Sequence, residues 1–380
     1  MMAVAADPRA SDMSPDAHAS QWTLTWRAFR RHKLALVSLF VVLTFALIGI
    51  LAEFVAPFDP GSTSSKDLYH PPQAIHFIDA TEDGGWAVRP YVHAMVVKRD
   101  PMTLQSVYSP DEGRKIYLSL FGEGTAYTMW GLISGNRHLF TTADPKDRFY
   151  LFGADRLGRD VFSRTVHGTR VSMSIGLLGV SLSLFIGLIL GGLSGYYGGT
   201  IDMVVQRLVE LILSLPTIPI WLGLSAALPQ DWPPMLRYFA ITVILSLVGW
   251  TELARVVRGR FLALRTEDFV TAARLDGGTQ LRVIFRHMMP SMFSHIIASV
   301  TLAIPAMIIA ETALSFLGLG LMPPTISWGV LLKEAQNVRS IAQAPWLFIP
   351  GAAVCLAVLA LNFLGDGLRD AADPYANEGR

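Results

Sequence analysis

Long uncharged runs alternate with short charged segments along this chain, and six of these runs are candidates to cross a membrane. A helix needs about 20 apolar residues to cross the hydrocarbon core of a bilayer. The predicted spans cover residues 34–56, 171–201, 211–230, 238–254, 288–310 and 345–365. The fourth is the shortest, and we expect its helix to continue through Glu252 beyond the uncharged stretch. The pattern therefore predicts an all-α polytopic membrane protein with six transmembrane helices.

Composition supports a membrane protein and excludes several other classes. Hydrophobic residues make up 52% of the 380 residues and charged residues 16%, whereas soluble domains carry about a quarter charged residues. The net charge of +1 lacks the basic excess typical of proteins that bind nucleic acid. The single cysteine, Cys355, cannot form an internal disulfide. No phosphate-binding lysine loop, nucleophile with an adjacent base or zinc framework is present, so we expect no cofactor, no metal and no catalytic site.

Lys and Arg residues crowd two segments beside the spans, which predicts the orientation of the chain. The first group precedes the first span, and the second lies between the fourth and fifth: Arg27, Arg30, Arg31 and Lys33, then Arg255, Arg258, Arg260, Arg265, Arg274, Arg282 and Arg286. Short loops rich in Lys and Arg stay in the cytoplasm. We therefore expect the terminal segments, 1–33 and 369–380, to be cytoplasmic and the long segment 57–160 to lie outside.

The external segment 57–160 is predicted to be a small β-rich insert between the first two spans. Apolar and polar residues alternate in stretches such as 91–97 and 115–121, separated by turn-forming Gly, Pro and Asp residues. This alternation is typical of half-buried strands. The insert could serve as a packing cap over the outer mouth of the protein or as a contact surface for an external binding protein, and the residues leave both open.

The loop between the fourth and fifth spans is predicted to form two short helices joined at a glycine corner. Phe269, Ala272 and Ala273 share one face of the first helix, which the pair Gly277-Gly278 can end. The second helix has an apolar stripe at the spacing i, i+3, i+4, i+7, formed by Leu281, Ile284, Phe285 and Met288. Such a stripe on a polar loop needs a protein partner or a lipid surface, and from physics alone either can serve.

The spacing within this loop resembles the EAA loop of ABC importer permeases. Thr271-Ala272-Ala273 is followed after three residues by Gly277, and after nine more by His287-Met288-Met289-Pro290. Thr271 stands where the family usually has Glu, and Met289 where it has Leu; Glu267 or Asp268 could replace the missing carboxylate. The resemblance implies that the loop, 255–290, couples to an ATPase. The expected coupling residues are Asp268, Phe269, Thr271, Ala272, Ala273, Gly277, Ile284, His287 and Pro290.

Further motifs resemble the permease subunits of dipeptide and oligopeptide ABC importers. They lie, in the family's order, at 26–35, 56–60, 151–164, 195–199, 314–320 and 364–370, whereas the stretch 75–148 matches no motif. The resemblance implies a type I ABC importer permease fold in the bacterial inner membrane, with a core at 161–368 that holds five of the spans. It also implies alternating access and three kinds of partner: a second, usually different permease subunit, two cytoplasmic ATP-binding subunits and a periplasmic solute-binding protein. This subunit would then not itself be an enzyme.

Ionisable residues near the ends of the spans are candidates to line the translocation pathway. Burying a charge in a membrane is costly, so Glu210 and Glu311 are expected either at the membrane interface or on the pathway, and Pro216 could permit a gating bend. The residues do not choose the solute, which could be a peptide, an oligosaccharide, an opine or nickel. A stand-alone secondary transporter and an intramembrane enzyme are the alternatives from other classes.

Overall fold

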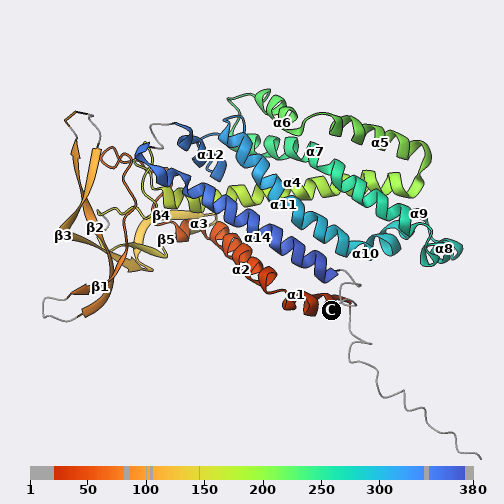
Figure 1. The fold of residues 1–380 in the computed structure, drawn as a ribbon, viewed down its shortest axis with the longest axis horizontal. Coiled ribbons are helices and arrows are strands. Elements are labelled where there is room, and N and C mark those ends of the chain that lie inside the picture. Colours follow the sequence, from red (N-terminus) through yellow and green to blue (C-terminus); the bar gives the residue numbers. More distant parts are fainter. Residues whose placement is uncertain are drawn as a thin grey trace, which may run out of the picture.

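In the computed structural model, a bundle of long helices carries a β-rich domain at one end (Figure 1). The structure describes residues 21–80, 86–99, 101–102, 106–144, 146–337 and 342–372; most of the two predicted cytoplasmic terminal segments therefore lies outside the described residues. The strands gather at the left of Figure 1 and the short helix α8 (Asp268–Leu275) lies at the far right. We call the end of the bundle that carries the strands the sheet end.

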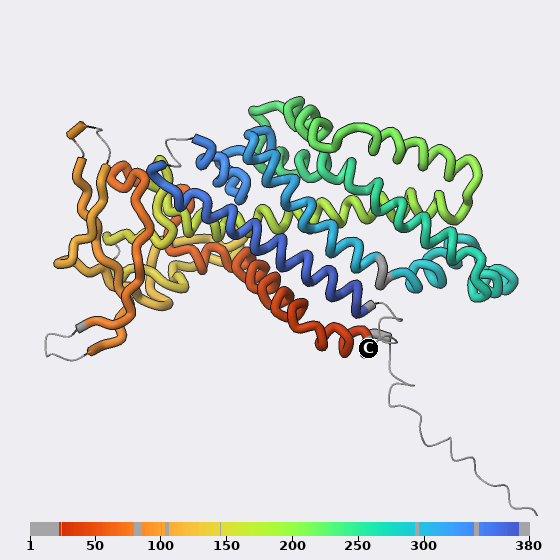
Figure 2. The backbone as a smooth tube through the Cα atoms, viewed as in Figure 1, coloured from red at the N-terminus to blue at the C-terminus, as the bar shows by residue number. Residues whose placement is uncertain are grey.

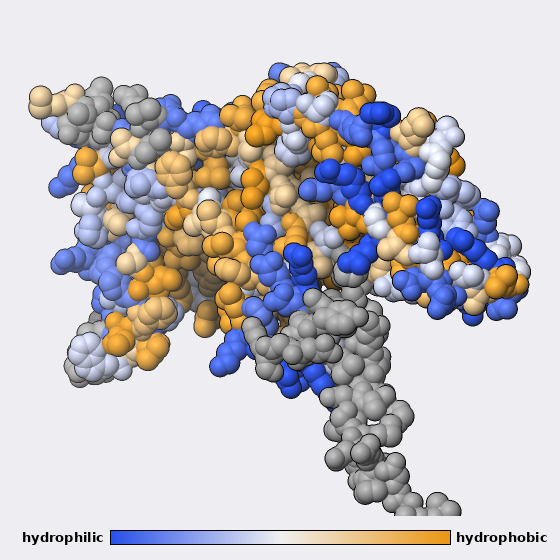
Figure 3. Space-filling model, turned by 45° about the vertical axis from the view of Figure 1, so that its right-hand side comes forward, coloured by the Kyte–Doolittle hydropathy of each residue, from blue (hydrophilic) through white to orange (hydrophobic). Residues whose placement is uncertain are grey.

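Five helices in the described part of the chain are long and apolar enough to cross a membrane. They are α2 (Lys33–Ile50), α4 (Val161–Tyr197), α7 (Pro234–Leu264), α11 (Phe293–Phe316) and α14 (Ile349–Ala372). Side chains exposed along these helices are largely apolar, and Figure 3 shows hydrophobic residues gathered over the middle of the bundle with hydrophilic residues toward both ends. The chain is therefore a multi-pass membrane protein.

The predicted third span is not one straight helix. The chain forms α5 (Gly199–Ser214) and α6 (Thr217–Ala226), which are bent by 85° at the break between them. Pro216 has no N–H group and disfavours helical backbone at the residue before it, and Leu215 is accordingly extended with ψ of 140°. The prediction of six crossings holds only if this bent pair is counted as one broken span.

The predicted fourth span continues as expected through Glu252, but its helix is much longer than the prediction. α7 has 31 residues and ends at Leu264. It packs closely against α4, because glycines on α4 face the backbone of α7. A Cβ atom at Gly187 would lie 2.9 Å from Leu253 Cβ, and one at Gly195 would lie 2.6 Å from Phe261 Cβ. Small residues of this kind allow membrane helices to approach closely.

The insert contains two antiparallel sheets. The larger has the order β1-β2-β3-β6, formed by β1 (His76–Ala80), β2 (Trp86–Arg99), β3 (Ser106–Leu120) and β6 (Phe140–Thr142). Its register pairs Tyr91 with Tyr117, and its core contains Val92, Ile116 and Phe149. The smaller sheet is the hairpin of β4 (Glu123–Met129) and β5 (Ile133–Arg137). The strands predicted at 91–97 and 115–121 are confirmed as parts of β2 and β3.

Shorter elements connect and flank the long helices. They are α1 (Gln21–Arg31), α3 (Ala52–Val55), α9 (Gln280–Arg282), the π-helix η2 (Val283–Met288), α10 (Met289–Ser291), α12 (Trp328–Lys333) and the 3-10 helices η3 (Glu334–Gln336) and η4 (Pro345–Phe348). Helix α1 packs beside the end of α14, where Phe29 and Ala35 contact Leu364. Figure 2 shows both chain ends of the described structure close together and away from the sheet end.

Candidate functional site

The segment from α8 to η2, which we call the helical projection, has the predicted helix–corner–helix shape. Helix α8 ends at Leu275, and the chain turns at Gly277, whose φ of +76° lies in the left-handed region that favours glycine. The Gly278 N–H donates to the Ala273 carbonyl and the Gly277 N–H to that of Arg274, each at 3.1 Å. Thr279 then caps α9 by accepting from the Arg282 N–H. The corner is therefore fixed by backbone hydrogen bonds.

One face of the helical projection is buried against the ends of two long helices. Val270 and Val283 are fully buried and pack with Phe261 of α7, and Met288 joins the same cluster with Ile296 of α11. The buried set differs from the expected stripe, because residues 283–288 form a π-helix and not an α-helix. Its wider turn brings residues five apart onto one face.

The opposite face leaves large apolar side chains exposed. Phe269 is 41% exposed, Leu281 63% and Phe285 60%, and Leu275 at the end of α8 is 83% exposed. Thr271 and Ala272 are also exposed, whereas Ala273 and His287 are half-buried. The helical projection thus has two apolar faces, and among the described residues only one of them is covered by other parts of the chain. A second apolar face of this size on a charged loop needs a covering surface, which a protein partner or lipid can supply.

Side-chain contacts attach the helical projection to α4 as well as to α7 and α11. The Tyr197 hydroxyl, at the end of α4, donates to Oε1 of Gln280 at 2.8 Å. The guanidinium of Arg274 lies 5.1 Å from the ring centroid of Tyr196. The helical projection is therefore attached to three of the long helices of the bundle.

The bundle holds an open cavity of about 630 Å³ between α4, α6, α7 and α11. Its polar lining includes Ser183, Thr251, Glu252, Ser299 and Arg369, and apolar residues such as Trp221 and Met307 complete it. An opening of this size with mixed polar and apolar walls can receive a small solute.

The three predicted pathway residues, Glu210, Pro216 and Glu311, do not line this cavity. Glu210 is exposed and pairs with Arg207 at 2.7 Å, and Pro216 lies at the bend between α5 and α6. Glu311 is fully buried, where its Oε1 accepts hydrogen bonds from Ser315 at 2.7 Å and Ser327 at 2.8 Å. It joins α11 to the start of α12.

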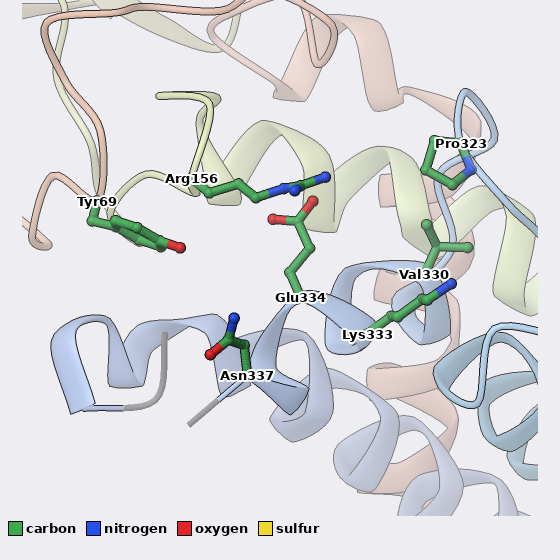
Figure 4. A pocket seen from close by; sticks show the side chains of 7 residues that line it. All are labelled: Tyr69, Arg156, Pro323, Val330, Lys333, Glu334 and Asn337. Atoms are coloured by element: carbon green, nitrogen blue, oxygen red, sulfur yellow. The ribbon is translucent and has the colours of Figure 1, made fainter. Parts of the chain in front are cut away.

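A second, smaller cavity of about 290 Å³ lies at the sheet end and was not anticipated from the sequence. Figure 4 shows Arg156 and Glu334 pointing toward one another across it, with Lys333 and Asn337 beside them. Glu334 pairs with Arg159 at 2.6 Å, while burial and the neighbouring Asp155 raise the pKa of Glu334. Asp155 and Arg159 lie in the motif at 151–164, but the partner Glu334 lies in a segment without a recognised motif. Only the fold brings them together.

Comparisons with known proteins identify two family models along the chain. The family described as binding-protein-dependent transport system inner membrane component matches residues 184–377. The N-terminal TM domain of oligopeptide transport permease C matches residues 20–72. Neither model covers residues 73–183, which include the strands of the insert.

Individual proteins with similar sequences are described in the same terms as these families. The oligopeptide transport system permease protein OppC of Bacillus subtilis is 35% identical over 238 residues, which are 62% of this chain and 75% of the relative. The dipeptide transport system permease protein DppC of the same species is 38% identical, over 60% of this chain and 70% of its own length. A putative peptide permease protein of Brucella ovis is 40% identical, over 59% and 73%. A solved structure of the MetNI methionine ABC transporter aligns with a TM-score of 0.44 at 17% identity, covering 56% of this chain and 97% of that one.

Proposed function

The chain belongs to the family of binding-protein-dependent transport system inner membrane components, and from this premise we propose that it is the membrane-spanning permease subunit of an ATP-driven importer of peptides. The peptide assignment rests on relatives whose names describe oligopeptide and dipeptide permeases. On this proposal the chain performs no covalent chemistry. Hydrolysis of ATP takes place in two separate cytoplasmic subunits, a second permease completes the membrane channel, and a periplasmic binding protein delivers the solute.

The observation that carries the proposal is the two-faced helical projection. Its inner face, with Val270, Val283 and Met288, is packed on α7 and α11. Its outer face presents Phe269, Leu281 and Phe285, which no other part of the described structure covers. A lever needs this arrangement, because one side must hold the membrane helices while the other is held by the moving subunit. The expected coupling residues Thr271, Ala272 and Gly277 lie at the exposed side.

The same contacts suggest how ATP-driven closure reaches the solute pathway. A shift of the helical projection moves the ends of α4, α7 and α11, which are attached to it. These helices also form the walls of the 630 Å³ cavity. Since α4 and α7 are locked together through their glycines, we expect the pair to move as one body. Alternating access then follows from opening and closing this cavity at the interface with the second permease.

The missing carboxylate of the EAA loop has two candidate replacements. Glu267 and Asp268 are both exposed at the start of α8, where a negative charge is favoured by the positive end of the helix dipole. Glu267 lies four residues and Asp268 three residues before Thr271, one helical turn away. We propose that Asp268 takes the ionic contact with the ATPase that Thr271 cannot make.

A direct test introduces a charge into the outer face. Phe285→Glu should weaken association with the ATP-binding subunits by more than about tenfold, because truncating or charging an interface hot spot costs about 2 kcal/mol or more. ATP-driven uptake should fall in parallel. Val107→Glu on β3, where the original side chain is 53% exposed at the sheet end, is the matched control and should leave both unchanged.

The Phe285→Glu variant, reconstituted in vesicles, also distinguishes the proposed ABC permease from a stand-alone transporter. A stand-alone secondary transporter would move solute in vesicles without ATP-binding subunits, and uptake by Phe285→Glu would equal that of the natural protein. Binding measurements on the cognate solute-binding protein would then distinguish peptides from oligosaccharides, opines or nickel. Retention of ATPase subunits by the Phe285→Glu variant would refute the docking surface.

A further inference from the structure

The β4–β5 hairpin ends in an apolar tip whose large side chains are more than half exposed in the described structure. Trp130 is 55% exposed, Ile133 64% and Leu132 85%. The opposite end of the same hairpin is polar and exposed, with Glu123, Asn136 and Arg137. Apolar and polar residues are therefore separated along the length of the hairpin, which is the pattern of a segment that crosses a boundary between two solvents.

The base of the hairpin is fixed to α3 beyond the end of the first span. His138, just after β5, is buried, and its ring nitrogens contact the carbonyl oxygens of Ala56 at 2.6 Å and Thr125 at 2.9 Å. The Leu139 N–H donates to the Phe54 carbonyl at 2.8 Å. Figure 1 shows the hairpin beside α3 at the sheet end.

The tip is fixed nearer to the membrane than the base. The indole N–H of Trp130 donates to the Ile50 carbonyl at 3.1 Å, at the last residue of α2. Ala56 lies six residues further along the chain, which corresponds to roughly 9 Å of helix at about 1.5 Å per residue. The hairpin therefore runs back along α3, from a base outside the span to a tip level with the end of the span.

The surface of α2 beside the tip is the surface expected to face lipid. A stripe of exposed apolar side chains follows the helix, consisting of Val37, Phe40, Leu43, Leu47 and Ile50. The tip meets this stripe at its last member. Leu132 and Ile133 thus extend an apolar surface that already continues along the whole span.

A charged pair marks the membrane boundary at the same level. Arg170 of α4 pairs with Glu53 at 2.5 Å, and its guanidinium lies 4.2 Å from the ring centroid of Trp130. Tryptophan is enriched at the membrane–water interface. Arg170 directly precedes the uncharged run 171–201 of α4, and a long arginine side chain in this position keeps its charge at the same interface. Trp130 and Arg170 therefore place the tip at the interface, with Leu132 and Ile133 free to enter the hydrocarbon.

We propose that the tip of the β4–β5 hairpin inserts into the leaflet at the sheet end of the bundle, where Trp130, Leu132 and Ile133 anchor the insert to phospholipid. The occupant of this apolar surface is lipid and not a protein partner. Anchored in this way, the insert is held at a fixed height and angle over the bundle, independently of any solute or binding protein. The proposal does not depend on the transported solute or on the ATPase contact.

A depth measurement tests the insertion directly. A nitroxide is attached at Leu132→Cys in the turn before β5, and a matched control carries it at Asn136→Cys on β5. Both variants are made in a Cys355→Ser background. The full chain, in its complex, is reconstituted into a bilayer of phosphatidylethanolamine and phosphatidylglycerol. At position 132 we expect collisions with lipid-soluble oxygen to exceed those with a water-soluble nickel chelate several-fold, and at position 136 we expect the reverse.

Two results would overturn the proposal. Equal access of the nickel chelate to positions 132 and 136 would mean that the tip lies in water. Protection of position 132 from both oxygen and the chelate would mean that a protein surface, such as the second permease, covers it. Both positions are exposed, and co-elution of the labelled chains with the complex reports that they are folded.

Discussion

The corner of the helical projection depends on the backbone conformation of a single residue, Gly277. Its φ of +76° is unfavourable for most other residues, yet no atom of the described residues lies within 4 Å of the place where a Cβ would sit. Conformation, and not space, therefore restricts this position. The neighbouring Gly278 differs, because a Cβ there would lie 2.6 Å from the Ala273 carbonyl oxygen.

The effect of a substitution at Gly277 should therefore depend on whether the new residue tolerates the left-handed region, and not on the size of its side chain. Gly277→Val forces a β-branched residue into the left-handed region, at a cost of about 1–2 kcal/mol, and should uncouple ATP hydrolysis from uptake while the protein still inserts. Gly277→Asn is larger than alanine but tolerates this region, and should retain most of the uptake. Measured together, equal uptake by the two variants would argue against the corner as a mechanical element.

A buried histidine in the insert gives the sheet end a dependence on pH. His70 is 5% exposed between the rings of Tyr108 and Tyr150, and its Nδ1 lies 2.7 Å from the Pro71 carbonyl oxygen. Burial lowers the pKa of His70, while the carboxylate of Asp67 opposes the shift. A lowered pKa means that the folded state favours the neutral ring.

Because the pKa of His70 is lowered in the folded state, acid should reduce the stability of the fold. His70 contributes stability above its unfolded pKa of about 6.5, and this contribution is lost as the pH falls through the lower folded pKa. The melting temperature of the natural protein should therefore fall more steeply below about pH 6.5 than that of His70→Gln. Thermal unfolding in detergent across this pH range measures the difference, and parallel curves would contradict the assignment.

At the scale of elements, the close contact of α4 and α7 depends on glycines that the sequence places on one face of α4. A Cβ at Gly191 would lie 2.9 Å from the Cα of Ala254, so Gly191→Ala must separate the two helices. Overpacking of this kind costs about 1–3 kcal/mol. The matched control is Gly223→Ala in α6, where nothing lies within 4 Å and a helical Gly→Ala change gains up to about 1 kcal/mol. Thermal unfolding should show opposite shifts for the two variants.

Helices and strands could be predicted where a single feature of the sequence, such as hydrophobic periodicity, determines the structure. They were less well predicted where a second feature, such as a proline, acts against it. The long apolar runs predict spans, because a helix in a membrane is apolar on all faces. The alternation at 91–97 predicts a strand, because a half-buried strand is apolar on one face only. The run at 211–230 predicts a crossing but does not give the 85° bend near Pro216, so it counts as a span only if α5 and α6 together form one broken span. Of the predicted apolar stripe after Gly277, Ile284 and Met288 are buried but Leu281 and Phe285 are exposed. The π-helix at Val283–Met288 changes the helical period there, and no residue type signals a π-helix.

The candidate site shows the same division. The glycine corner and the helices on either side of it follow from spacing, and the structure has them where the sequence predicts. The sequence does not show which apolar residues face inward, because Phe269 and Val270 are both apolar and adjacent. Only the position of Phe261 on α7 decides between them. The burial of Glu311 by serines from α11 and the start of α12 likewise depends on contacts between distant segments.

For the whole molecule, the arrangement of the ends predicts a single orientation in the membrane. Helix α1, the end of α14 and the helical projection all lie away from the sheet end (Figure 2), and the basic segments before α2 and after α7 lie with them. The positive-inside rule places such segments in the cytoplasm, which is also where ATP is available to a coupling partner. The sheet end, with its β-rich insert, then faces the periplasm.

Labelling from one side of the membrane tests this orientation. Thr271→Cys in α8 and Val107→Cys in β3 are exposed positions at opposite ends of the bundle, and Cys355→Ser removes the natural thiol. In spheroplasts, a membrane-impermeant maleimide should modify position 107 at once and position 271 only after permeabilisation. The reverse pattern would place the helical projection outside the cell, where no ATP-binding subunit could reach it. Because both residues lie in one chain of fixed topology, each position serves as the control for the other.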